Sequence, residues 1–166
     1  IVVPPIELNG EIISSTKIRT FIEAGDVNKA AQFLGYPYAL RGKVIEGKGR
    51  GRVLGFPTAN LAYDKTKVIP KHGVYLTLTL IDDVFIWSLT NIGNNPTFRQ
   101  ESLCIETYLL GYSGDLYGIE IEVYFLERIR DEIRFNSAED LIKQLNTDVI
   151  TAKKHIYKII QMCYNT

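Results

Sequence analysis

The residues best suited to do chemistry are gathered between Gly47 and Asn60. Gly47, Gly49 and Gly51 alternate with other residues, so their backbone N–H groups can approach an anion without a Cβ atom in the way. Positive charge is added by Lys48, Arg50 and Arg52. This pattern predicts a phosphate-binding loop that runs on to Gly55. A solvated hairpin loop and a nucleic-acid-binding loop are the alternatives.

Neither of the two common glycine-rich nucleotide motifs fits this loop. Residues 42–48 match the first part of a Walker loop, but Gly49 stands where that motif needs Ser or Thr, and no helix pattern follows. The dinucleotide motif fails because Arg52 and Leu54 stand where its last glycine belongs. Any phosphate is therefore held by a different kind of loop.

Two oxygen ligands follow the loop. Thr58 offers a hydroxyl and Asn60 an amide oxygen two residues later, so both face the same side of an extended segment. Hard, neutral oxygens suit Mg²⁺ and leave its charge available to nucleotide phosphates. The pair indicates a magnesium site, and a turn that merely ends the loop is the alternative.

One carboxylate stands out in the second half of the chain. Alternation over residues 103–110 places Glu106 on the same face as Cys104, Tyr108 and Leu110, a largely apolar set. A half-buried carboxylate costs free energy unless it is paired or used, which makes Glu106 a candidate general base. A structural salt bridge to one of the loop arginines is the alternative.

Two further segments carry weaker signals. Arg130 lies near Arg128 and Arg134 in the sequence, and Phe135 follows them. Arg130 could hold a phosphate or stack on a ring, although exposed arginines at strand ends are commoner. Residues 91–98 read as a turn-rich loop that could shape a pocket wall.

Short strands are the elements that must position these residues. Alternating apolar residues predict strands at 39–46, 76–80, 84–92, 102–110 and 119–126. Because no helix separates them, an antiparallel sheet closed into a barrel or sandwich is favoured over a doubly wound α/β fold. One long helix is predicted to begin at Ser137, and its apolar stripe indicates that it packs against the sheet.

The first 35 residues have a different pattern. Ser14 and Asp26 can cap two short helices that end at Gly25 and Gly35. Helices this short cannot build a core alone, so residues 1–35 are interpreted as the tail of a preceding domain or as an appendage packed on residues 36–166.

The composition excludes several classes of protein. The chain carries 19 basic and 19 acidic residues, but residues 41–75 hold eight basic and two acidic side chains, and residues 76–130 hold three and eight. A basic stretch followed by an acidic one suggests a polyanion site with carboxylates nearby. The two distant cysteines favour a reducing cytoplasm, and no apolar run approaches the roughly 20 residues that span a bilayer.

Taken together, these motifs resemble the riboflavin kinase family. In bacteria this module usually forms the C-terminal half of the bifunctional riboflavin kinase/FMN adenylyltransferase, or FAD synthetase. The resemblance covers about residues 36–157. The matching segments, in chain order, are Gly47–Asn60, Gly73–Tyr75, Asn91–Gly93, Pro96–Phe98, Glu106, Gly114–Gly118 and Ile129–Phe135.

The resemblance implies a mainly β fold, namely a six-stranded antiparallel Greek-key barrel with a C-terminal helix. It also implies transfer of the γ-phosphate of Mg-ATP to the 5′-hydroxyl of riboflavin, giving FMN and ADP. By match to the family, Thr58 and Asn60 hold Mg²⁺ and ATP phosphates, and Glu106 is the catalytic base. The nucleotide is covered by a loop that includes Gly47, Gly49, Arg50, Gly51 and Gly55. Arg130 and Phe135 belong to the flavin side.

The resemblance extends weakly into the first 35 residues, because Ile13–Arg19 looks like the last nucleotide-binding motif of the adenylyltransferase half. These residues contain no counterpart of that half's His-containing loop, so this chain alone is not expected to make FAD. Three positions depart from the family: Asn95, Tyr108 and Gly111 stand where Arg, His and Asp are common. A basic nucleic-acid-binding barrel and a non-catalytic flavin-binding domain are the alternatives, and neither nucleic acid nor a membrane is expected as a partner.

Overall fold

A computed structural model describes residues 4, 6–47, 49–96 and 101–164 of the chain. In chain order its elements are β1 (Glu7–Leu8), β2 (Glu11–Ile12), α1 (Ser15–Ala24), α2 (Val27–Leu34), β3 (Ala39–Ile45), α3 (Arg50–Val53), β4 (Thr58–Tyr63), β5 (Gly73–Ile81), β6 (Val84–Pro96), β7 (Glu101–Leu109), β8 (Glu120–Arg130) and α4 (Ala138–Tyr164). Among the described residues, no helix has both the length and the apolar character needed to cross a membrane.

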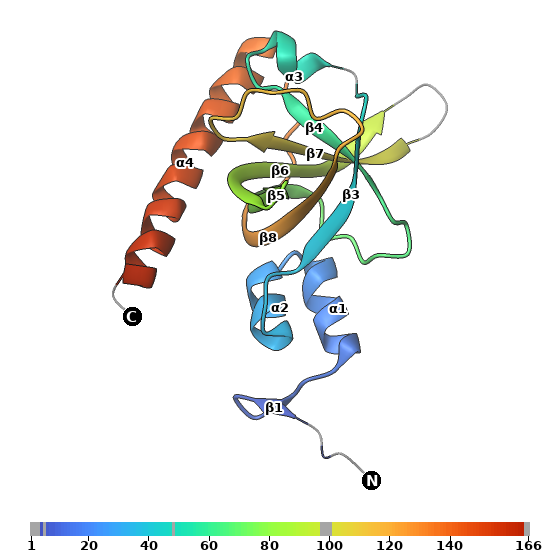
Figure 1. Cartoon of the computed structure of the whole chain (residues 1–166), viewed down its shortest axis with the longest axis vertical. Coiled ribbons are helices and arrows are strands. Elements are labelled where there is room, and N and C mark those ends of the chain that lie inside the picture. The colour runs from blue at the N-terminus through green and yellow to red at the C-terminus, as the bar shows by residue number, and fades with distance from the viewer. Residues whose placement is uncertain (1–3, 5, 48, 97–100, 165–166) are drawn as a thin grey trace.

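Six strands close into an antiparallel barrel in the order β3-β4-β7-β6-β5-β8 (Figure 1). This confirms the predicted barrel with a C-terminal helix. Strand β4 was anticipated only as an extended segment around Thr58 and Asn60, because its apolar run is short. The loop predicted at residues 91–98 is wrong for residues 93–96, since they continue strand β6 beyond the predicted end at residue 92 and pair with β7. Residues 97–98 of that segment lie outside the described part.

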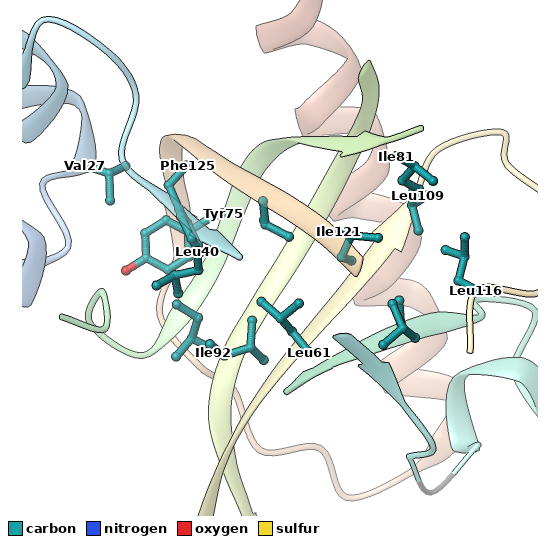
Figure 2. Packing of buried hydrophobic residues seen from close by; sticks show 14 residues of the cluster. Val27, Leu40, Leu61, Tyr75, Ile81, Ile92, Leu109, Leu116, Ile121 and Phe125 are labelled. Carbon is teal, nitrogen blue, oxygen red and sulfur yellow. The ribbon is translucent and has the colours of Figure 1, made fainter. Parts of the chain in front are cut away.

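The barrel interior is apolar at its centre and contains one chain of hydroxyls. Buried residues such as Leu40, Leu61, Tyr75, Ile92, Ile121 and Phe125 fill it (Figure 2). A row of hydrogen bonds of 2.7–3.0 Å links the fully buried hydroxyls of Thr79, Ser88, Thr77, Thr90 and Thr107. Since Thr107 faces inward, its neighbours Glu106 and Tyr108 face outward, as the strand alternation requires.

Helix α4 covers part of the outer face. Ala152 of the helix packs with Val74, Leu76 and Leu89 of strands β5 and β6 in a second buried cluster. The Ser137 hydroxyl accepts a hydrogen bond from the Asp140 N–H at 3.1 Å, so the helix begins where the capping residue predicts. Figure 1 shows α4 running along one side of the barrel, with α3 near its N-terminal end.

The two N-terminal helices form as predicted. Ser14 and Asp26 accept hydrogen bonds from the N–H groups three residues later, and Gly25 and Gly35 end the helices with φ values of 83° and 84°. The small hairpin of β1 and β2 was not anticipated. Its signal was present, because Asn9-Gly10 is a turn sequence that favours positive φ at both positions.

Helix α2 packs against one end of the barrel. Val27 is only 1% exposed and belongs to the same buried cluster as Leu40, Tyr75 and Phe125 (Figure 2). The buried core of the barrel therefore includes a residue of α2, which lies before residue 36.

Candidate functional site

A cleft of about 410 Å³ opens on the outer face of the barrel. The glycine loop and β4 form one side, β6 and β7 contribute the floor, and the end of β8, residues 132–135 and α4 form the other side. Of the residues predicted for the site, the cleft brings together Gly47, Gly49, Gly51, Thr58, Asn60, Glu106, Arg130 and Phe135.

Two predicted residues are not among its described lining. Gly55 lies at the end of the loop with φ 82°, where a non-glycine residue would be strained. The Arg50 side chain lies outside the described part of the chain, as does Lys48.

Strand register places Glu106 at the centre of the cleft. Asn60 of β4 lies directly opposite Glu106 on one side, and Asn91 of β6 lies opposite it on the other. Directly opposed residues share a face of the sheet, with Cβ atoms roughly 4.5–5.5 Å apart. Val74 and then Arg130 continue the same row across β5 and β8. Asn91 was not predicted as a site residue, because its place beside Glu106 depends on which strands pair.

The Glu106 carboxylate is half-buried and lines the cleft. The described side chains, which include Arg52, provide it with no hydrogen bond or ion pair. Of the two loop arginines that could form the alternative salt bridge, Arg52 makes no ion pair with Glu106, and the Arg50 side chain lies outside the described part of the chain. As far as the described side chains show, the carboxylate is open to a ligand in the cleft.

The glycine at position 47 is explained by close contact with Asn60. A Cβ atom at Gly47 would lie 2.1 Å from the Asn60 Nδ2 atom, so the Asn60 amide or the loop would have to shift. The Cys104 thiol donates a hydrogen bond of 3.1 Å to Asn60 Oδ1, so the amide is held on two sides. Asn60 is buried and Thr58 half-buried, and both reach the same cleft, as their spacing predicts.

The glycine loop is more ordered than an open loop. Residues 50–53 form the short helix α3, and the Phe56 N–H closes the turn on the Gly51 carbonyl at 2.8 Å. The Phe56 ring packs edge-on against Tyr108, with centroids 5.3 Å apart. Tyr108, one of the departures from the family pattern, therefore supports the loop from the strand that carries Glu106. Gly111, another departure, has φ 74° in the turn after β7.

The far end of the cleft contains an ion pair between Arg130 and Asp148, and Asp148 is not among the predicted site residues. The Arg130 guanidinium donates from Nε and Nη2 to the two carboxylate oxygens of Asp148, at 2.9 and 2.7 Å. Phe135 is half-buried and lines the same cleft as Arg130 and Asp148. This end therefore combines an aromatic ring with a charge-compensated guanidinium.

Comparisons with known proteins agree with this geometry. The family model for riboflavin kinase, or flavokinase, matches residues 34–156. A bifunctional riboflavin kinase/FMN adenylyltransferase from Listeria monocytogenes is 42% identical over 137 residues, which are 82% of this chain and 44% of the relative. The chain thus spans less than half the length of that curated relative.

Two solved structures share the fold. A protein from Streptococcus pneumoniae named as a macrolide-efflux protein has a TM-score of 0.86 and 38% identity, covering 92% of this chain and 50% of that one. The riboflavin kinase from Trypanosoma brucei has a TM-score of 0.53 and 25% identity, covering 74% and 81%. Because the family model matches most of the chain, this protein belongs to the riboflavin kinase family.

Proposed function

We propose that this chain transfers the γ-phosphate of ATP to the 5′-hydroxyl of riboflavin, giving FMN and ADP. The observation that carries the proposal is the open Glu106 carboxylate, set between Asn60 and Asn91 in a cleft of a riboflavin kinase fold. A hydroxyl bound at this row has both a proton acceptor and neighbouring amides with which to form hydrogen bonds.

The two ends of the cleft suit the two substrates. At the glycine loop, backbone N–H groups and the exposed Arg52 favour an anion, so we assign this end to the ATP phosphates. At the other end Arg130 is neutralised by Asp148, and Phe135 and Leu141 add apolar surface. A neutral, flat ring system fits this second end, which we assign to riboflavin.

The proposed step needs little chemistry from the protein. The riboflavin 5′-oxygen attacks the γ-phosphorus, the bond to the β–γ bridging oxygen breaks, and ADP leaves with that oxygen. The hydroxyl proton passes to the Glu106 carboxylate. Phosphoryl transfer depends mainly on position and charge neutralisation, so Glu106 serves first to orient the alcohol.

Magnesium fits the donor set of Thr58 and Asn60. Their hydroxyl and amide oxygens are hard, neutral ligands on the same face of β4, and Mg²⁺ commonly takes few protein ligands and completes its shell with phosphates and water. When bound there, the ion neutralises charge on the transferred phosphate. The described residues contain no cluster of three His, Cys, Asp or Glu side chains that could hold a metal. We propose Thr58 Oγ1 and Asn60 Oδ1 as its protein ligands, because both oxygens reach the cleft from the same face of β4.

For the whole protein, the names of the relatives suggest a second activity. We infer that residues 1–35 are the end of an adenylyltransferase half and that this chain alone does not make FAD. A reducing cytoplasm remains the proposed location, because Cys104 and Cys163 lie far apart in the sequence and do not suggest a disulfide framework.

The variant Glu106→Gln tests the proposed base. The amide keeps the size of the side chain but accepts no proton, so we expect FMN formation to fall at least 100-fold, since general-base catalysis contributes about 10²–10⁴-fold. ATP binding, followed by calorimetry, is expected to change less than about threefold because Glu106 does not bind phosphate.

The control is Glu120→Gln, the same change at an exposed strand glutamate that pairs with Arg41. We expect it to retain normal turnover. Near-normal FMN production by Glu106→Gln would remove Glu106 from the mechanism. Strong, salt-sensitive RNA binding without FMN formation would instead favour the nucleic-acid alternative, and riboflavin binding without ATP consumption would favour a non-catalytic flavin domain.

A further inference from the structure

Asp148 is a buried acid in helix α4, beside the flavin end of the cleft. Its side chain is only 3% exposed, and a carboxylate in that setting costs free energy unless its oxygens are satisfied. Arg130 reaches both oxygens, and Gln144 Nε2 donates to Oδ1 at 2.8 Å. The position of this carboxylate is therefore fixed by three hydrogen bonds.

The ion pair joins two walls of the cleft. Arg130 is the last residue of β8, and its Nη1 atom donates to the Asp131 carbonyl at 2.9 Å. Residues 131–137 then lead to α4 and carry Phe135, which lines the cleft together with Leu145 of the helix. Because Arg130 fixes the start of this connection and Asp148 fixes the helix, the pair sets the spacing of the two walls.

The pair also decides what Arg130 can recognise. A guanidinium has five N–H donors, and three are used by Asp148 and the Asp131 carbonyl. The remaining donors can still bind a carbonyl in the cleft. Asp148 cancels the positive charge, however, so this end attracts a phosphate less than an unpaired arginine would.

On the basis of the proposed function, we propose that Asp148 is a positioning residue for riboflavin. It holds the Arg130 guanidinium and the wall formed by residues 131–135 in the arrangement that receives the neutral flavin ring. A purely structural role would lower stability and affect both substrates alike, whereas positioning affects riboflavin selectively.

The variant Asp148→Asn removes the charge and preserves the size of the side chain. We expect the KM for riboflavin, and its Kd from flavin fluorescence without ATP, to rise at least tenfold. The KM for ATP is expected to change less than twofold. The control is Asp140→Asn, the same change at an exposed site on the same helix, and it should alter neither KM by more than twofold.

A second variant separates positioning from stability. Replacing the pair by Arg130→Met together with Asp148→Leu fills the space with apolar side chains, which commonly restores the stability of a buried ion pair. We expect the melting temperature to recover while riboflavin affinity stays at least tenfold weakened. Recovery of normal riboflavin affinity, or equal weakening of both substrates in Asp148→Asn, would overturn the proposal.

The binding measurement separates this proposal from the proposed function. If the wild-type chain binds riboflavin but forms no FMN, the kinase assignment fails and the fluorescence titration still decides the role of Asp148. If the wild-type chain binds no riboflavin, both fail.

Discussion

Glu106 stands between two amides because three strands meet in one register row. Asn60, Glu106 and Asn91 lie on β4, β7 and β6, all on the outer face of the barrel. Their side chains therefore come from rigid strands and not from loops, which limits the error in their relative positions. Such rigidity suits a reaction in which orientation of the alcohol is the main requirement.

Gly47→Ala tests the contact that holds Asn60. The added Cβ atom would lie 2.1 Å from Nδ2 and 2.9 Å from Oδ1 of Asn60, so either the amide or the loop must move. We expect the KM for Mg-ATP to rise at least tenfold, because the proposed magnesium ligand is displaced. Steady-state kinetics at varied ATP measure this change.

The matched control is Gly35→Ala, which also replaces a glycine but lies at the end of α2. Its φ of 84° makes alanine cost about 1 kcal/mol, while nothing lies within 4 Å of the new Cβ. It should lower the melting temperature without changing the KM for ATP. A normal KM in Gly47→Ala would contradict the proposed role of Asn60.

The sequence predicts individual site residues better than their neighbours. Alternation along one strand is sufficient to place Glu106 on a different face from Ile105 and Thr107. No local pattern shows that Asn91 lies beside it, since this depends on strand pairing. Asp148 does have a sequence signal, because it is an acid on the apolar stripe that runs through Leu145 and Ala152.

At the scale of elements, capping residues predict boundaries well. Helices α1, α2 and α4 begin after Ser14, Asp26 and Ser137, whose side chains satisfy free N–H groups. The elements that are not predicted from the sequence are short. The two-residue strands β1 and β2 and the four-residue helix α3 offer too few residues for a periodic pattern to appear.

Val27→Ala tests whether α2 is part of the barrel's folding unit. Val27 is fully enclosed in the barrel cluster, so removing two carbon atoms should lower the free energy of unfolding by about 2 kcal/mol. Trp87, the single tryptophan, lies in β6 and packs against the buried cluster of Val74, Leu76, Leu89 and Ala152, so its fluorescence follows unfolding of the barrel. We expect the urea midpoint of unfolding, followed by Trp87 fluorescence, to fall in Val27→Ala.

The control is Val84→Ala, the same change at a valine that is 59% exposed, for which the loss should stay below about 0.5 kcal/mol. An unchanged Trp87 midpoint in Val27→Ala would mean that residues 1–35 are an independent appendage.

At the scale of the whole molecule, folding brings the basic stretch of residues 41–75 and the acidic stretch of residues 76–130 together. The net charge is zero, but Arg52 belongs to the basic stretch and Glu106 to the acidic one. Pairing of β4 with β7 places both in one cleft. The charge pattern alone suggests two halves of a site, and the strand pairing decides which carboxylate reaches it. Glu120, by contrast, lies on the exposed face of β8 and pairs with Arg41.

The most direct test is incubation of the full chain with riboflavin, ATP and Mg²⁺, with FMN, FAD and ADP separated by chromatography. We expect FMN and ADP to form in equal amounts, only when ATP is present, and we expect no FAD. A correctly folded chain that leaves riboflavin unchanged under these conditions would contradict the assignment of this cleft to riboflavin phosphorylation.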